Sequence, residues 1–230
     1  MFALDFRISE QMRLATTEQF KLATLNNAFD MSDSVNAKTH ANFTSADELF
    51  GNNVYIRGGV MGNYSNKFVI SDSYLNEFKQ FIQNFTTPLP WKSEDYIILT
   101  NGLCGSACAL FAEHAAKFNN VTTVAVGGIA SNPLLSYSSF IGGAVFNSIE
   151  VFESLDKLAL LNNSLMPKSF PLAGMEVTFT TYEAYSKINL DEILEFTFRP
   201  ADFRLFYNEK NIRNVSILWS QTAALIGSKR

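Results

Sequence analysis

The stretch IILTNGLCGSACALFAEHAAKF, residues 97–118, most constrains how this chain can fold. An apolar run stops at an Asn-Gly turn, and a helix-forming run follows at once. A second apolar run, over 121–126, ends at Gly127 and Gly128. A strand, a helix and a second strand in this order indicate a crossover between parallel strands, so we expect an α/β fold.

Periodicity and capping residues outline the rest of the chain. Ser9 and Asp72 each precede an amphipathic pattern and are expected to cap a helix. Residues 51–70 are expected to form a loop with short strands. Beyond the unit over 96–126, we expect helices over 9–25, 72–84, 149–161 and 211–226, and strands over 175–182 and 193–198.

Composition excludes several classes of protein. Hydrophobic residues make up 47% of the 230 residues and charged residues 17%, which is typical of a globular protein. The net charge is −4 and no basic patch is visible, so nucleic-acid binding has no electrostatic support. The longest uncharged stretch, Phe118 to Ile149, is interrupted by Asn132-Pro133 and by glycine pairs. We therefore expect no membrane helix there, but a buried strand and loops.

Acceptor sites for glycosylation are more frequent than chance predicts. The chain has six Asn-x-Ser/Thr sites, where its composition predicts about three. They lie at Asn42, Asn63, Asn84, Asn120, Asn162 and Asn214. The N-terminal MFALDFRISEQ carries Asp5 and Arg7 and is not a signal peptide. The surplus of sites nevertheless favours an extracellular or secretory-pathway location.

Ser106 lies where the first strand turns into a helix, a position suited to a nucleophile. Active sites of open α/β sheets tend to lie at this edge, and free N–H groups at a helix start can bind an oxyanion. Gly105 allows close approach of the backbone. The pattern G-x-S-x-G is not met, because position 108 is Cys. A serine at a helix start can equally be an N-cap, and the spacing alone leaves both alternatives open.

A nucleophilic serine needs a base, and the chain has only two histidines. His114 lies eight residues beyond Ser106, about 12 Å along the same helix, which is too far for a hydrogen bond. His40 is interpreted as a solvated loop residue.

The two cysteines offer little alternative chemistry. Cys104 and Cys108 are too few for a disulfide framework, and we interpret them as small buried thiols beside the turn. A cysteine nucleophile at the helix start stays open. With His114 the two cysteines give too few ligands for zinc, so we expect no metal and no cofactor.

Taken together, three segments resemble one family. ILTNGLCGSACALFAEHAAKFNNVTTVAVGG is similar to the nucleophile segment of the C-terminal-processing (tail-specific) serine peptidases. Cysteines on both sides of the serine are typical of the fungal and protist branch related to the chlamydial protease-like activity factor. EFTFRPADFRLFY at 195–207 and YIRGGVMGNYS at 55–65 resemble further segments of that branch.

This resemblance implies a crotonase-like α/β fold and a serine-type endopeptidase acting on a polypeptide substrate. Ser106 would be the nucleophile, and the N–H of Ala107 would supply half of the oxyanion hole. GGIASNPLL, where bacterial members carry a lysine base, has no lysine, which fits the Ser/His/Glu version of the site. The orienting glutamate is expected to be Glu183, with Glu192 and Glu195 as later choices.

The same resemblance bears on the extent of the chain. We expect one peptidase domain over 1–230, with the serine segment at 96–128 and a late strand and helix segment at 174–226. The family takes its histidine and second oxyanion donor from segments expected upstream of residue 1, so the chain is expected to be a C-terminal portion. The alternative is a catalytically incomplete fragment that acts as a peptide-binding or scaffold module. A homo-oligomer is left open.

Overall fold

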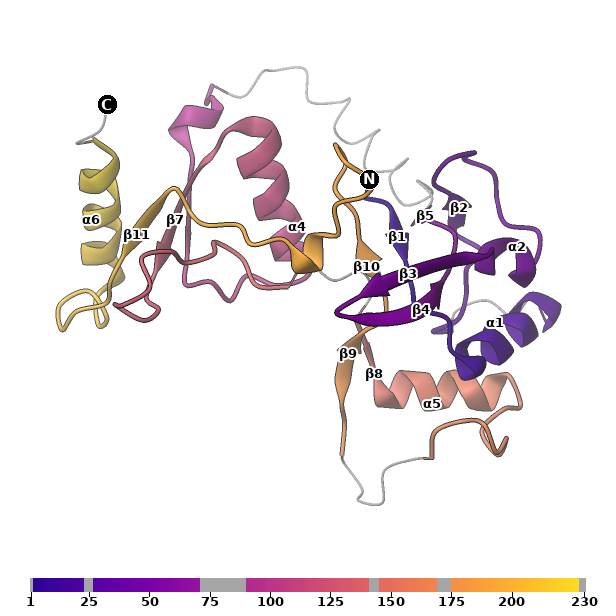
Figure 1. Ribbon diagram of the computed structural model, residues 1–230. Coiled ribbons are helices and arrows are strands. Elements are labelled where there is room, and N and C mark those ends of the chain that lie inside the picture. Colours follow the sequence, from indigo (N-terminus) through magenta and orange to yellow (C-terminus); the bar gives the residue numbers. More distant parts are fainter. Residues whose placement is uncertain (1, 23–26, 71–89, 141–144, 169–174, 228–230) are drawn as a thin grey trace. The chain divides into compact units, whose positions relative to one another are not determined.

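The computed structural model describes residues 2–22, 27–70, 90–140, 145–168 and 175–227, and they form two compact units (Figure 1). Unit 1 comprises Met1–Thr86 and Gly142–Glu195, and unit 2 comprises Thr87–Ile141 and Phe196–Arg230. Each unit is therefore built from two separate chain segments. This division does not test whether residues 1–230 form one peptidase domain, which stays a prediction.

A four-stranded antiparallel sheet forms the centre of unit 1. Its order is β10-β1-β5-β2, with β1 at Leu4–Asp5, β2 at Ser34–Asn36, β5 at Phe68–Ile70 and β10 at Glu183–Ala184. Aromatic rings fill the space beside it: Phe6, Phe68 and Tyr182 lie with ring centroids 5.2–6.1 Å apart. Such edge and tilted contacts add to the free energy gained from burial.

The segment 51–70 forms short strands, as predicted. β3 (Asn53–Arg57) and β4 (Val60–Tyr64) make an antiparallel hairpin. Its two turn residues are Gly58 and Gly59, with φ of 59° and 78°. A two-residue type I′ turn needs positive φ at both central positions, which glycine adopts without steric cost. The Arg-Gly-Gly sequence thus places Arg57 at the end of a tight hairpin.

In the described part of unit 1, three α-helices and a further antiparallel strand pair complete the fold. α1 (Glu10–Leu22) confirms the predicted helix and its cap, since the Met12 N–H donates to Ser9 Oγ over 3.1 Å. α2 spans Ala46–Phe50 and α5 spans Ser148–Lys157. β8 (Val145–Asn147) and β9 (Thr178–Thr180) pair antiparallel before and after α5 in the chain.

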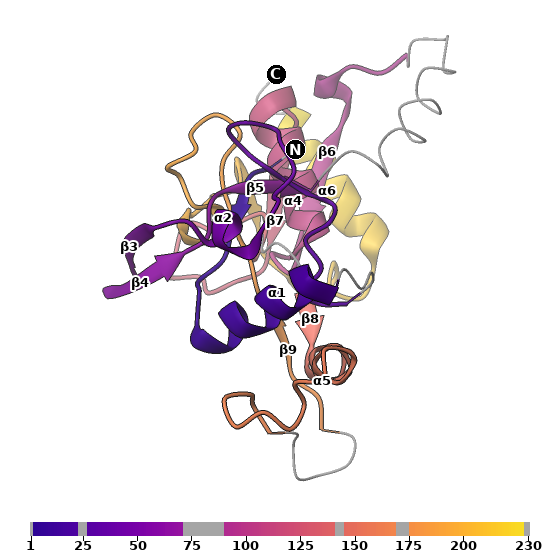
Figure 2. The same cartoon turned by 90° about the vertical axis from the view of Figure 1, so that its right-hand side faces the viewer.

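The helix predicted over 149–161 ends earlier than expected. Asn147 and Glu150 form a capping box at its start, but the last helical residue is Lys157. Beyond it Ala159 adopts a φ of 56°, and the Leu160 N–H donates back to the Leu155 carbonyl over 2.8 Å. Leu158 and Leu160, beyond the last helical residue, are buried in the core. Figure 2 views α5 along its axis. The core cluster contains Ala15, Ala28, Phe29, Leu155, Leu158, Leu160 and Met166.

Unit 2 contains the strand–helix–strand unit predicted from the sequence. β6 (Ile97–Thr100) pairs parallel with β7 (Thr122–Val126), which confirms the expected parallel pair. Between them lies α4 (Ala107–Glu113), which continues as a π-helical turn, η2 (His114–Phe118). The short 3₁₀ helix η1 (Ser93–Asp95) precedes β6.

The predicted strand over 193–198 is wrong, and the third strand of the sheet lies later. Leu194–Phe196 forms a 3₁₀ helix, η3, because the Glu195 carboxylate accepts the Ala184 N–H and holds this stretch in a turn. The strand is β11 (Phe203–Leu205), which pairs parallel with β7 in the order β11-β7-β6. α6 (Val215–Gly227) closes the unit, with Leu218, Thr222 and Ile226 buried along one face.

The helix predicted over 72–84 lies outside the described residues. The strand predicted over 175–182 is shorter than expected, because within that range only Thr178–Thr180 forms a strand. The fold mixes helices with sheets, while the crotonase-like topology stays a prediction. In the part of the chain that the structure describes, each helix is too short or too polar to cross a bilayer.

Candidate active site

Ser106 has an unusual backbone conformation at the start of α4. Its φ is 53° and its ψ is −126°, a region that residues with a Cβ rarely adopt. Ser106 occupies the N-cap position, yet its side chain makes no capping hydrogen bond. The helix-cap alternative therefore lacks the interaction that defines it, and the hydroxyl is not engaged by the first turn of α4.

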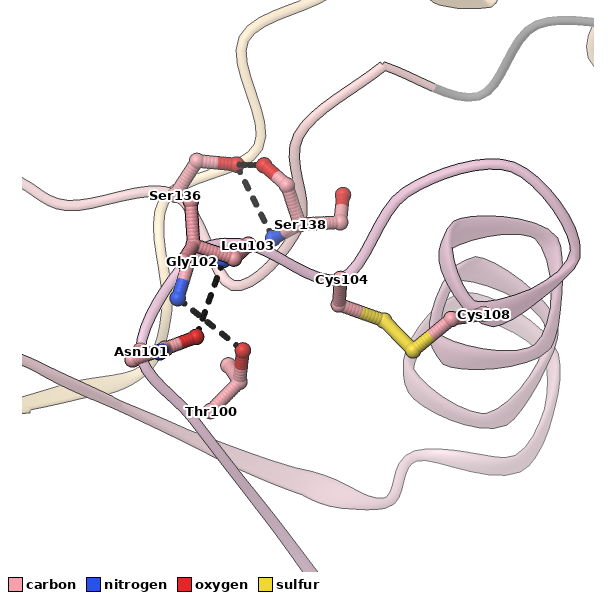
Figure 3. Close-up of a disulfide and its surroundings, with 8 residues drawn as sticks. All are labelled: Thr100, Asn101, Gly102, Leu103, Cys104, Cys108, Ser136 and Ser138. Atoms are coloured by element: carbon pink, nitrogen blue, oxygen red, sulfur yellow. Dashed lines mark hydrogen bonds between the residues drawn. A yellow bond between two sulfur atoms is a disulfide. The ribbon is translucent and has the colours of Figure 1, made fainter.

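The turn before Ser106 is built by local hydrogen bonds, as the Asn-Gly pair predicts. The Gly102 N–H donates to Thr100 Oγ1 over 3.0 Å, and the Leu103 N–H donates to Asn101 Oδ1 over 3.1 Å (Figure 3). Gly102 has a φ of 84°, which favours glycine. The turn thus leads the chain from β6 towards Ser106 in a defined direction.

Cys104 and Cys108 form a disulfide, so the prediction of two free buried thiols is wrong. Figure 3 shows the bond joining the segment before Ser106 to the first turn of α4. The helix begins between the two cysteines and brings their Cα atoms to 5.2 Å, which lies within disulfide range. Cys108 is exposed and Cys104 half-buried. The disulfide removes both the cysteine-nucleophile and the zinc alternatives for this pair.

A second segment, residues 136–140, packs against the serine turn. The Ser106 N–H donates to the Phe140 carbonyl over 2.8 Å, and the Ser139 N–H donates to the Cys104 carbonyl over 2.9 Å. Gly105 lies between these two bonds, and a Cβ there would meet both Phe140 Cε1 and Ser139 Oγ at 2.9 Å. The lack of a side chain at Gly105 therefore allows the backbone to approach residues 136–140 closely.

The first amide of α4 is placed as an anion donor would be. Ala107 is exposed, and its N–H precedes the internal hydrogen bonds of the helix. The next amide, that of Cys108, donates to the Gly105 carbonyl over 3.1 Å. The N–H of Ser106 is taken by Phe140, so Ala107 is the amide beside the serine that suits an oxyanion.

As expected, His114 lies at the far end of the helix that begins after Ser106, and His40 is an exposed loop residue. Ser106 and His114 mark opposite ends of α4, as N-cap and C-cap. The His114 ring is stacked on Phe118, with the centroids 5.1 Å apart, and the residue is exposed. His40 is an exposed turn residue of unit 1 with a φ of 57°. His114 does not reach Ser106, as expected from the helix rise.

Glu183 lies in β10 of unit 1, within a charged cluster. It forms an ion pair with Arg57, whose Nη2 also lies 2.7 Å from Asp5 Oδ2. Asp5 is fully buried and also accepts a hydrogen bond from the Tyr185 hydroxyl over 2.6 Å. Burial raises the pKa of Glu183 above its ordinary value, against the opposing attraction of Arg57.

The two later choices for the orienting glutamate also lie in unit 1. The Glu195 carboxylate accepts the Ala184 N–H, with its oxygens at 3.0 and 2.9 Å. The Glu192 carbonyl accepts the Ser186 N–H over 3.0 Å. Glu195 thus contacts Ala184, which follows Glu183 in β10.

A buried carboxylate that sequence reasoning missed lies on α4 itself. Glu113 is 2% exposed, and its Oε2 lies 2.7 Å from Arg199 Nε. The Tyr137 hydroxyl donates to the same oxygen over 2.6 Å, and burial together with this bond raises the pKa of Tyr137. Glu113 lies on the face of Ala109 and Ala112, so helical spacing alone could have indicated a buried glutamate.

The segment RPADFR connects the sheet to the loop after β7. Asp202 Oδ2 accepts both the N–H and the hydroxyl of Thr123 at 2.8 Å. Arg204 donates to the carbonyls of Gly127 and Ile129 through Nη2, over 2.8 and 2.9 Å. These charged residues therefore hold β7 and the start of the loop that continues to residues 136–140.

An apolar groove of about 530 Å³ adjoins the disulfide on unit 2. α4 contributes Phe111 and α6 contributes Trp219, both largely exposed. The complete lining is Ile98, Leu99, Thr100, Asn101, Leu103, Cys104, Cys108, Phe111, Ala112, Val126, Tyr207, Val215, Leu218 and Trp219. Its walls suit apolar side chains of a bound molecule.

Comparison with known proteins finds no matching family model, no matching curated protein and no matching solved structure. The chemistry of the site therefore has to be argued from its own residues. Among the described residues, no three His, Cys, Asp or Glu side chains gather as they would around a metal ion. The arrangement offers a strained, uncapped serine, a neighbouring amide and an apolar groove.

Proposed function

We propose that Ser106 is the nucleophile of a serine-type endopeptidase that cleaves polypeptides. The observation that carries this proposal is the backbone of Ser106, with φ 53° and ψ −126° in a strand-to-helix turn. A strained turn of this kind projects a nucleophilic hydroxyl away from the sheet. Strain at a non-glycine residue persists only where the surroundings impose it, and such residues cluster at functional sites.

In the proposed reaction the Ser106 hydroxyl attacks the scissile carbonyl and transfers its proton to a general base. The carbonyl oxygen becomes an oxyanion, which the N–H of Ala107 stabilises. A base returns the proton to the leaving amine, and water then hydrolyses the acyl-enzyme. The base is proposed to be a histidine, as in the Ser/His/Glu version of the site that the family resemblance implies.

An extracellular or secretory-pathway location is part of the proposal. The Cys104–Cys108 disulfide supports it, because such bonds persist in oxidising compartments. Five of the six glycosylation acceptors lie in the described residues, and all five are exposed, as attachment requires. Asn84 lies outside the described residues.

A second candidate function is a peptide-binding module without catalysis. It is supported by the position of His114 at the opposite end of α4 from Ser106, and by the apolar groove beside the disulfide. In this alternative the fold keeps the serine turn but lacks a working base.

A fluorophosphonate probe separates the two proposals, because it labels activated serines. The peptidase proposal predicts stoichiometric labelling at Ser106 in the purified full-length protein, located by mass spectrometry. The Ser106→Ala variant should lose the label, and Ser216→Ala, an exposed serine of α6, should retain it. A chain that stays unlabelled while correctly folded would favour the binding module. Cleavage of an unfolded protein, lost in Ser106→Ala, would then identify the reaction.

A further inference from the structure

We propose that the Cys104–Cys108 disulfide is a redox-sensitive positioning element that holds Ser106 in its reactive conformation. The inference rests on the proposed function, since it concerns the reactivity of the same serine. The bond closes a five-residue loop, residues 104–108, with Ser106 at its centre. The disulfide therefore joins the residue two positions before Ser106 to the residue two positions after it.

Among the described residues, two backbone hydrogen bonds join this loop to residues 136–140, from Ser106 to Phe140 and from Ser139 to Cys104, and Gly105 packs against the same segment. The Ser106 side chain contributes no capping bond. The buried ion pair of Glu113 with Arg199 fixes the opposite end of α4. The disulfide is thus the covalent constraint at the end of the helix that carries the serine.

Without the disulfide, the conformation of Ser106 loses its main support. A residue with a Cβ is more stable at negative φ, so an open loop relaxes away from a φ of 53°. This relaxation changes the position of the Ser106 hydroxyl relative to the Ala107 N–H, which the proposed reaction uses together. Reduction is therefore expected to lower the reactivity of the serine while leaving the sheet intact.

The bond is open to a dithiol reductant from solvent. Cys108 is exposed, and the two cysteines line the edge of the apolar groove. A thiolate of the reductant attacks Sγ of Cys108, forming a mixed disulfide and releasing Cys104 as a thiolate. The second thiolate of the reductant then closes its own disulfide and releases Cys108. Two electrons pass to the cysteines, which take up protons from water, and the reductant leaves as a cyclic disulfide.

The test measures the rate of fluorophosphonate labelling before and after treatment with dithiothreitol. Reduction is verified by alkylation and mass. In the wild-type chain we expect labelling of Ser106 to slow about tenfold, the size of effect that relief of backbone strain allows. The Cys104→Ser/Cys108→Ser double variant should label as slowly as the reduced chain and should not respond to dithiothreitol.

A second readout does not depend on catalysis. In Ser106→Ala, hydrogen exchange of residues 101–110 and 136–140 should accelerate on reduction, while β7 stays protected. Unchanged exchange and unchanged labelling after verified reduction would overturn the positioning role. If no serine is labelled in either redox state, the peptidase proposal fails. The exchange data then decide separately whether the disulfide positions the turn.

Discussion

The backbone N–H of Ser106 donates to the carbonyl of Phe140 over 2.8 Å, across a long stretch of chain. This bond ties the start of α4 to the loop that follows β7. It also occupies the Ser106 amide, so in the proposed reaction the Ala107 amide is the one beside the serine that can stabilise the oxyanion. The serine turn is therefore shaped by two parts of unit 2 together.

Replacing Ser106 with glycine should stabilise unit 2. Glycine adopts a φ of 53° without the steric cost of a Cβ, so we expect the free energy of unfolding to rise by about 1 kcal/mol. Hydrogen exchange of the buried amides of β7 measures this change. The matched control, Ser216→Gly in α6, should cost about 0.5–1 kcal/mol, because glycine is unfavourable within a helix. Equal losses in both variants would contradict strain at Ser106.

Replacing Gly105 with alanine should displace residues 136–140. The new Cβ would lie 2.9 Å from both Phe140 Cε1 and Ser139 Oγ, so one of the two segments must shift. Overpacking of this kind costs about 1–3 kcal/mol, and labelling of Ser106 should fall with it. Gly227→Ala is the control, since nothing lies within 4 Å of a Cβ at that position. Normal labelling of Gly105→Ala would show that the segment does not support the serine.

Removing the Glu113 side chain should weaken unit 2 strongly. Glu113→Ala leaves Arg199 buried without its carboxylate, and loss of one partner of a buried pair costs about 3–5 kcal/mol. Lys117→Ala removes only the partly exposed cation 3.6 Å from Glu113, and should cost less than about 1 kcal/mol. Exchange of β7 amides compares the two. Similar costs would rule out a special role for the pair with Arg199.

The raised pKa of Glu183 makes the stability of unit 1 depend on pH. A carboxyl group whose pKa is higher in the folded state favours folding most when it is protonated. Relative to Glu183→Gln, the free energy of unfolding of the wild type should therefore fall as pH rises from about 4 through the folded pKa. Carboxyl NMR should place that pKa above the ordinary value of 4.5. A lowered pKa would mean that Arg57 outweighs burial.

Local patterns predicted the elements that depend on neighbouring residues. Ser9 caps α1 through the Met12 amide, and the Asn-Gly turn after β6 forms as expected. The parallel pair β6 and β7 followed from a helix lying between two apolar runs. In each case the deciding interactions lie within a few residues, where sequence spacing specifies geometry.

The missed features depend on contacts that spacing does not specify. Arg199 pairs with Glu113 across a long stretch of sequence, and its charge alone gave no sign of burial. β11 has three residues, too few for a strand pattern to be recognised. The end of α5 is set by Leu158 and Leu160 entering the core, and tertiary packing overrides the helical pattern there.

The disulfide was missed for a different reason. A count of two cysteines argued against a framework of bridges, but a single bond across a helix start needs only a suitable distance. That distance follows from where α4 begins, which is the position of Ser106 itself. The position of Ser106 and the pairing of its flanking cysteines therefore both depend on where α4 begins.

The interleaved segments of the two units set an order for folding during synthesis. β1 pairs with β10, so Leu4 waits for Ala184 to emerge from the ribosome before the sheet of unit 1 can close. β7 likewise waits for β11, while Cys104 and Cys108 are within reach of each other from the start. Contacts between such distant residues slow folding, because long loops must close first. The nascent chain would thus be able to form the Cys104–Cys108 loop early, and would complete the four-stranded and three-stranded sheets late.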